Sequence, residues 1–207
     1  MYKVFIDNHP ILFLKSDKTE TNIPTKYGLR LSTQDFASFS CEVNLNHKDA
    51  PFYVKSPFPL ESLKHFFSDF VWIEAAGGIV ENLNTNKLLF IHRNGFWDIP
   101  KGKIEANEDP SKAAMREIQE ECGLKKLNIV SSLSPTYHVY NLYGKYWIKK
   151  THWFVLNTQE TEVKPQTDEG ITEATWFNKN NLEKVYENTF SSILEVLQEY
   201  KNKFPFD

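Results

Sequence analysis

The chain has 207 residues, of which 41% are apolar, and a formal charge of −3 at pH 7. This length suits one large domain, or one domain with a small accessory module. The slightly acidic balance provides no basic surface for duplex nucleic acid or an anionic membrane, so we expect neither as a partner. Two cysteines do not make a disulfide framework, and no segment is typical of a signal peptide or a transmembrane helix. We therefore expect a cytoplasmic protein.

Residues 1–70 predict a small accessory α/β module. Apolar and polar residues alternate over residues 2–6, a turn-forming Asn-His-Pro follows, and the next apolar run predicts a hairpin. The other elements expected here are a short helix after Ser32 or Thr33, a strand over residues 51–55 and a helix from Pro59. No catalytic constellation occurs in this segment. Its aromatic residues are typical of a core or an interface, and a homodimer contact is one expected use of them.

Residues 71–102 predict two strands that lead into a loop. Residues 71–80 form a nearly continuous apolar run with small residues, which indicates a strand that another backbone approaches closely. A turn over residues 82–86 separates it from a second strand over residues 87–93, and the two predict a hairpin. Asn94-Gly95 then turns the chain toward Gly102.

A helix over residues 110–122 follows. Asp109 is placed to cap its first turn, Pro110 occupies a position where no N–H is needed, and Gly123 suits a left-handed end. The helical spacing also predicts a narrow apolar stripe, which consists of Ala114, Ile118 and Cys122. This stripe is expected to face the core.

Three carboxylates crowd a neighbouring face of this helix. Glu117, Glu120 and Glu121 lie at positions i, i+3 and i+4, where like charges repel one another. Arg116 offsets part of the repulsion, but one arginine does not neutralise three carboxylates. Hard oxygen ligands favour Mg²⁺, or Mn²⁺ as a substitute, so the spacing indicates a divalent-cation site. An ordinary solvated acidic face is the alternative that the spacing alone leaves open.

Gly102 is followed after five residues by Glu108, and after seven more by the run REIQEECGL, which begins at Arg116. This spacing over residues 102–124 resembles the signature of the Nudix hydrolase family. The signature fixes seven residue identities and two apolar positions, and this chain fills all of them. The approach to the motif, Phe-Trp-Asp-Ile-Pro-Lys-Gly, is also similar to that of Nudix chains.

The chain after the motif predicts the rest of a sandwich. The expected elements are strands over residues 128–134, 146–157 and 175–177, an aromatic-rich loop or hairpin over residues 137–144, a polar loop over residues 164–170 and an amphipathic helix from Asn181 onward. Residues 71–207 are thus expected to form the Nudix α/β/α sandwich with a mixed sheet that the resemblance implies, preceded by the small α/β module.

The resemblance implies an Mg²⁺-dependent hydrolase that cleaves a nucleoside diphosphate linked to another group. It places Glu117, Glu120 and Glu121 in the metal shell, together with the carbonyl oxygen of Gly102, and it makes Arg116 an orienting partner. A bound cation would neutralise the charge of the phosphates and lower the pKa of a water molecule.

The resemblance also suggests a carboxylate on a loop beyond the motif. Glu169 is the best positional match and is the candidate general base, while Glu120 or Glu121 could carry the proton instead. Glu108 is expected to have a structural role near the start of the helix, where a carboxylate suits the helix dipole.

Basic and aromatic residues outside the helix indicate how a substrate would bind. The candidates for contact with the polyphosphate or the nucleobase of a substrate are Arg93, Lys101, Lys103, Lys149, Lys150 and Tyr140. The Pro-Lys-Gly-Lys sequence over residues 100–103, together with Tyr140, resembles the Nudix branch that cleaves dinucleoside polyphosphates and diphosphoinositol polyphosphates, so diadenosine tetraphosphate is the expected substrate. ADP-ribose, nucleotide sugars and oxidised nucleoside triphosphates are the alternatives. A non-catalytic nucleotide sensor is the alternative of another class, disfavoured because every motif carboxylate is present.

Overall fold

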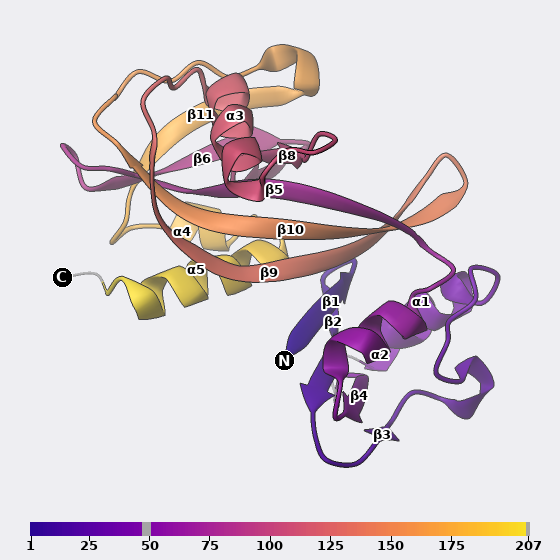
Figure 1. The fold of residues 1–207 in the computed structure, drawn as a ribbon. Coiled ribbons are helices and arrows are strands. Elements are labelled where there is room, and N and C mark those ends of the chain that lie inside the picture. The colour runs from indigo at the N-terminus through magenta and orange to yellow at the C-terminus, as the bar shows by residue number, and fades with distance from the viewer. Residues whose placement is uncertain (47–50, 206–207) are drawn as a thin grey trace. The chain divides into compact units, whose positions relative to one another are not determined.

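The computed structural model describes residues 1–46 and 51–205 and divides the chain into two compact units (Figure 1). The first combines Met1–Ile73 with Thr136–Lys150, and the second combines Glu74–Pro135 with Thr151–Asp207. The predicted accessory module, residues 1–70, lies within the first unit, which also takes in residues 136–150. In the described part of the chain, every helix falls short of the length and apolarity that crossing a membrane requires.

A small sheet and two α-helices make up the first unit. Its strands are β1 (Tyr2–Ile6), β2 (His9–Lys15), β3 (Glu20–Thr21), β4 (Tyr53–Ser56) and part of β9 (Asn128–Leu142), and its helices are α1 (Phe36–Asn46), α2 (Pro59–Phe66) and the 3-10 turn η1 (Thr25–Tyr27). The predicted hairpin is present, because β1 and β2 pair antiparallel. β2 pairs parallel with β4, and β3 pairs antiparallel with β4.

Residues 136–150 join the first unit through backbone pairing and apolar packing. β1 pairs parallel with β9, where Val4 lies opposite Tyr137. Tyr137, Val139 and Ile148 are buried in the same core as the phenylalanines of α1 and α2. The segment predicted as a loop or hairpin over residues 137–144 is therefore the end of a long hairpin. In it, β9 continues well past the predicted end at residue 134 and turns into β10 (Lys145–Thr158).

A sheet with the strand order β11-β6-β5-β10-β9 is the centre of the second unit. Its further strands are β5 (Val71–Asn82), β6 (Lys87–Arg93), β7 (Phe96–Asp98), β8 (Lys101–Lys103) and β11 (Ile171–Asn178). β5 and β6 form the predicted antiparallel hairpin, and the short strands β7 and β8 pair with β6 and β5 respectively. Parallel and antiparallel ladders both occur in the chain, as a mixed sheet requires.

Helices cover both faces of this sheet. α3 (Pro110–Cys122) lies on one face, and α4 (Glu183–Tyr186) and α5 (Ser191–Lys203) lie on the other (Figure 1). The apolar run in β6 explains this arrangement, because successive side chains of a strand point to opposite faces. Leu88 and Phe90 pack in the core with α5, whereas Leu89 and Ile91 pack in the core with α3. The predicted α/β/α sandwich is confirmed.

Gly77 and Gly78 let neighbouring backbone come close to β5. A Cβ atom on Gly77 would lie 2.2 Å from the carbonyl oxygen of Pro100, and one on Gly78 would lie 2.5 Å from that of Phe154. No side chain fits at such distances, so the small residues admit another backbone as predicted. Because Pro100 directly precedes β8, this close packing positions the strand that carries Gly102.

The single helix predicted from Asn181 onward is wrong, because the structure has two helices there, α4 and α5. The backbone between them pairs with β7. The Trp97 N–H donates to the Asn188 carbonyl at 2.9 Å, and the Thr189 hydroxyl donates to the Trp97 carbonyl at 2.7 Å. Residues 188 and 189 therefore form a bridge with a strand instead of continuing a helix.

Candidate active site

The ends of α3 are formed by the residues predicted from the sequence. Asp109 accepts a hydrogen bond from the Ser111 N–H at 2.8 Å, and Pro110 is the first helical residue. Gly123 has a φ of 74°, a left-handed conformation that a residue with a Cβ atom adopts only at a cost. The predicted apolar stripe is fully buried and consists of Ala114, Ile118 and Cys122. Because this stripe faces the sheet, the carboxylates beside it reach the strands that surround the helix.

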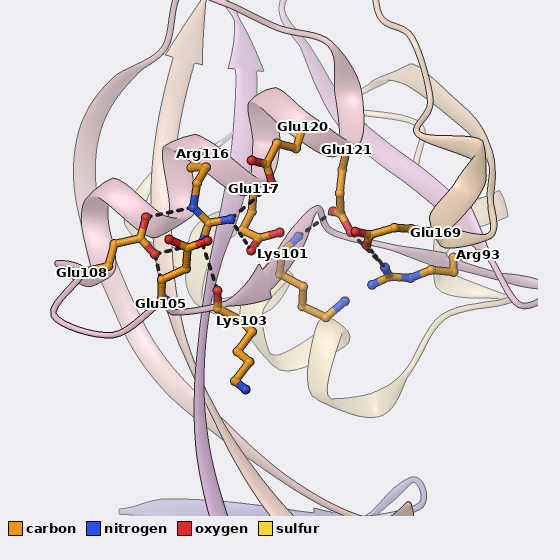
Figure 2. Close-up of polar contacts among 10 residues, drawn as sticks. All are labelled: Arg93, Lys101, Lys103, Glu105, Glu108, Arg116, Glu117, Glu120, Glu121 and Glu169. Atoms are coloured by element: carbon orange, nitrogen blue, oxygen red, sulfur yellow. Dashed lines mark hydrogen bonds and ion pairs between the residues drawn. The ribbon is translucent and has the colours of Figure 1, made fainter.

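Arg116 connects the carboxylates of the motif. Its guanidinium donates to the two oxygens of Glu108 at 2.9 and 2.8 Å. It also donates to Glu117 at 2.7 Å, to Glu120 at 3.2 Å and to the Lys103 carbonyl at 3.0 Å (Figure 2). The pKa of Glu108 is lowered to about 2, mainly by its hydrogen bonds with Arg116. Glu108 thus anchors the arginine, and the arginine orients two motif glutamates.

Gly102 makes room for the carboxylate of Glu117. A Cβ atom on Gly102 would lie 1.9 Å from Oε2 of Glu117. Burial raises the pKa of Glu117; the negative charges of Glu120 and Glu169 act in the same direction, and Arg116 acts against them. The glycine of the signature therefore has a steric reason in this fold.

Gly102→Ala is expected to lower the free energy of unfolding by about 1–3 kcal/mol, because the added methyl group displaces the Glu117 carboxylate. Urea unfolding of the wild type, Gly102→Ala, Glu117→Ala and the double variant measures this effect. If the clash is the cause, the double variant should be as stable as Glu117→Ala alone. Additive losses would instead assign the effect to another neighbour of Gly102.

Glu121 is the most deeply buried of the motif carboxylates, with 1% of its side chain exposed. Its Oε1 accepts a hydrogen bond from Nη1 of Arg93 at 2.9 Å, and its Oε2 accepts one from the backbone N–H of Lys101 at 2.8 Å. Burial raises the pKa of Glu121 to about 7, although the positive charges of Arg93 and Lys101 act in the opposite direction. Both oxygens of Glu121 are therefore engaged within the protein.

Glu169 belongs to η2 (Thr167–Glu169), in a loop that is fastened to the end of α3. The N–H groups of residues 164 and 166 donate to the last carbonyls of that helix, at 2.8 and 3.1 Å. Glu169 stays half exposed, and its Oε2 lies 3.9 Å from Nη1 of Arg93. The loop thus brings Glu169 to the arginine that pairs with Glu121 (Figure 2).

The chemistry of these side chains fits a divalent cation. Besides Glu108, which anchors Arg116, four carboxylates share the guanidinium groups of Arg93 and Arg116, namely Glu117, Glu120, Glu121 and Glu169. Carboxylate oxygens are hard ligands that suit Mg²⁺ or Mn²⁺, and their excess negative charge favours a cation. Over residues 1–46 and 51–205, however, no three His, Cys, Asp or Glu side chains stand close enough to hold an ion together. A guanidinium instead pairs with one oxygen of each of the three motif glutamates, so the carboxylates have to move closer together to hold one cation jointly.

The two lysines of β8 were predicted to contact the polyphosphate of a substrate, and this stays a prediction. The ammonium of Lys101 pairs with Asp98, and only 11% of the Lys101 side chain is exposed. The side chain of Lys103 points away from the motif glutamates (Figure 2). Lys101 instead contributes its backbone N–H to Glu121.

The other predicted substrate residues divide between the two units. Tyr140 and Lys150 belong to the first unit, in which the ammonium of Lys149 lies 5.8 Å from the centre of the Tyr140 ring. Their contacts with a substrate stay predictions. Arg93 is the predicted substrate residue whose charged group the structure brings to the carboxylates.

Asp98 belongs to this site, although the sequence analysis did not single it out. Its Oδ2 pairs with the ammonium of Lys101, and its Oδ1 accepts a hydrogen bond from the Ile99 N–H at 2.8 Å. An acidic residue inside the otherwise apolar run Phe-Trp-Asp-Ile-Pro was the available signal, because a charge buried among apolar residues needs a partner.

The fold and the site define the class of this protein as an α/β/α sandwich with an acidic helix on one face of its sheet. The model of the NUDIX domain matches residues 72–198, so the chain belongs to the Nudix family. The predicted family is confirmed.

Individual relatives and solved structures agree with this assignment. The chain is 31% identical over 108 residues to Nudix hydrolase 25 of Arabidopsis thaliana. This match covers 44% of this chain and 61% of that protein. It is 44% identical over 54 residues to an 8-oxo-dGTP diphosphatase of Proteus vulgaris, in a match that covers 24% of this chain and 48% of that protein. Both matches span less than two thirds of the relative. The MutT protein from Methanosarcina mazei Go1 superposes with a TM-score of 0.52 at 16% identity, over 67% of this chain and 99% of that chain, and shows the same fold.

Proposed function

We propose that this protein is an Mg²⁺-dependent hydrolase that cleaves a phosphoanhydride bond in a nucleoside polyphosphate. The observation that carries the proposal is the meeting of four carboxylates with two arginines around a complete family motif (Figure 2). Every phosphate of such a substrate is negatively charged, so its hydrolysis needs positive charge and a correctly placed water molecule. Mn²⁺ is the expected substitute for Mg²⁺.

Glu117, Glu120 and Glu121, with the carbonyl oxygen of Gly102, are the proposed ligands of the cation. When bound, the cation supplies positive charge to the phosphates and lowers the pKa of a water molecule. Arg116 keeps two of these carboxylates oriented through its contacts of 2.7 and 3.2 Å. This orientation limits the reorganisation that the site undergoes during the reaction.

Glu169 is the proposed general base. Its side chain is 51% exposed, so water reaches it readily. Glu121 is a weaker candidate because both of its oxygens already accept hydrogen bonds, and Glu120 is engaged by Arg116. A base has to lie within hydrogen-bond reach of the water whose proton it takes, and the proposal places that water beside Glu169.

The proposed substrate is a dinucleoside polyphosphate such as diadenosine tetraphosphate. Each added phosphate needs a further cationic contact, and Arg93 is the candidate at the carboxylates, since a guanidinium matches phosphate oxygens in two places. Lys101, Lys103, Lys150 and Tyr140 remain candidates for the more distant parts of the substrate. An oxidised nucleoside triphosphate is the second candidate, favoured by the likeness to an 8-oxo-dGTP diphosphatase over 54 residues.

A hydrolysis screen tests this proposal. Diadenosine tetraphosphate, 8-oxo-dGTP, ADP-ribose and a nucleotide sugar are incubated with the protein and Mg²⁺, and the products are separated by chromatography. We expect the highest kcat/KM with diadenosine tetraphosphate. A higher kcat/KM with ADP-ribose would overturn the substrate and keep the activity. No hydrolysis of any of them with Mg²⁺ or Mn²⁺ would overturn the activity and favour a nucleotide sensor.

We also propose that residues 1–70 act as an accessory module, with a homodimer contact as one use of it. All four carboxylates and both arginines belong to the second unit. Deleting residues 1–70 would remove the strand that pairs with residues 137–139 and would expose Tyr137 and Val139. The module therefore has to be studied in the full chain.

A further inference from the structure

Arg93 links two carboxylates that come from different segments of the second unit. Its Nη1 donates to Oε1 of Glu121 at 2.9 Å and lies 3.9 Å from Oε2 of Glu169 (Figure 2). Arg93 ends β6, where it pairs with Phe96 of β7 and with Ile171 of β11. Its side chain is 21% exposed and that of Glu121 is 1% exposed. The two side chains therefore form a mostly buried ion pair whose arginine is held on both sides by strand pairing.

Because only 1% of the Glu121 side chain is exposed, a divalent cation reaches its oxygens only if a group that covers them moves. Oε2 accepts the backbone N–H of Lys101, which lies in β8, and β8 is paired with β5. Moving that N–H away would disrupt the strand pairing. The guanidinium of Arg93 stands at the end of a flexible side chain, so it is the partner that moves at lower cost. A cation bound by Glu121 would therefore take the place of the guanidinium at Oε1.

We infer that Arg93 competes with the divalent cation for Glu121. The inference rests on the proposed function, which makes Glu121 a ligand of that cation. The guanidinium and the cation carry like charges, so they repel each other when both lie beside the Glu121 carboxylate. Arg93 therefore stabilises the protein that holds no cation. It also weakens cation binding, because the free energy lost when the Arg93–Glu121 ion pair breaks offsets part of the free energy gained when the cation binds. Cation binding in turn frees Arg93 for the phosphate of the substrate, which makes Arg93 a positioning residue that favours binding of the cation first.

Binding of Mn²⁺ alone, followed by electron paramagnetic resonance, tests the competition. Arg93→Gln should bind Mn²⁺ at least ~5-fold more tightly than the wild type. Arg93→Lys should lie between them, because it keeps the charge without the planar guanidinium. Lys112→Gln removes a positive charge from an exposed position on α3, the helix that carries Glu121, and should bind Mn²⁺ as the wild type does. Equal or weaker binding by Arg93→Gln would overturn the inference, since Arg93 would then be absent from the competition or would preorganise Glu121.

Thermal unfolding provides a readout that does not depend on activity. Without a divalent cation, Arg93→Gln leaves the Glu121 carboxylate without its charged partner, so the Tm should fall below that of the wild type. Saturating Mg²⁺ should then raise the Tm of Arg93→Gln more than that of the wild type, because tighter binding stabilises the native state further. A smaller or equal rise would contradict the inference. A wild-type protein that binds neither cation would instead overturn the proposed function, so the two failures are distinguishable.

Discussion

Glu120→Gln is expected to lower kcat by about 10²–10³-fold while the fold keeps its stability. The side chain of Glu120 is 50% exposed, and it contacts Arg116, which remains paired with Glu108 and Glu117. Loss of one exposed ion pair changes the free energy of unfolding by about 1 kcal/mol or less. A fall in kcat at constant Tm would therefore report the part of the carboxylate in the reaction. Steady-state hydrolysis and thermal unfolding of both proteins measure the two quantities.

Glu105→Gln is the matched control for this experiment. Glu105 is exposed and lies in the loop before α3, so the change removes the same charge close to the helix. We expect wild-type kcat from this variant. Near wild-type kcat from Glu120→Gln, or undiminished hydrolysis by the wild type in excess EDTA, would contradict a cation held by this helix.

Glu121→Ala is expected to lower the free energy of unfolding by about 3 kcal/mol, and hydrolysis should be lost as well. The carboxylate is buried and joins Arg93 to the backbone of Lys101, so its removal leaves a guanidinium and an N–H without their acceptor. The expected loss is at the lower end of the range for broken buried ion pairs, because Arg93 is partly exposed and Glu169 lies nearby. Urea unfolding without a divalent cation measures it.

The comparison of Glu121→Ala with Glu120→Ala separates stability from catalysis. The two residues are adjacent in the motif and carry the same charge, but one is buried and the other is half exposed. We expect both alanine variants to lose hydrolysis and only Glu121→Ala to unfold at a clearly lower urea concentration. Identical unfolding midpoints would show that the contacts of Glu121 contribute little to the fold.

The helix that carries the motif was predictable to the residue because its determinants are local. Asp109 caps the helix through a contact two residues away, Pro110 presets the first turn, and Gly123 ends it in a left-handed conformation. The hairpin of β5 and β6 was predictable for the same reason, since the apolar runs and the turn between them are neighbours in the sequence. The family followed from the spacing of the motif, and the matching domain model confirms it.

The extent of several elements depended on partners that are distant in sequence. Strand β9 continues past residue 134 because its later part pairs with β1, more than a hundred residues earlier. The last helix is interrupted because residues 188 and 189 pair with Trp97. Apolar periodicity reports that a face is buried, but it does not report which backbone groups a distant strand will take as partners.

The amino-acid sequence by itself determined the family, the motif helix and the set of acidic residues on that helix, because these follow from residue identity and from spacing within a few turns. Only the tertiary structure decided how the charges pair. The contact of Arg93 with Glu121, the pairing of Lys101 with Asp98 and the approach of Glu169 to Arg93 join separate strands and loops. A charge in a sequence has many candidate partners, and burial selects among them because an unpaired charge is costly where water is excluded.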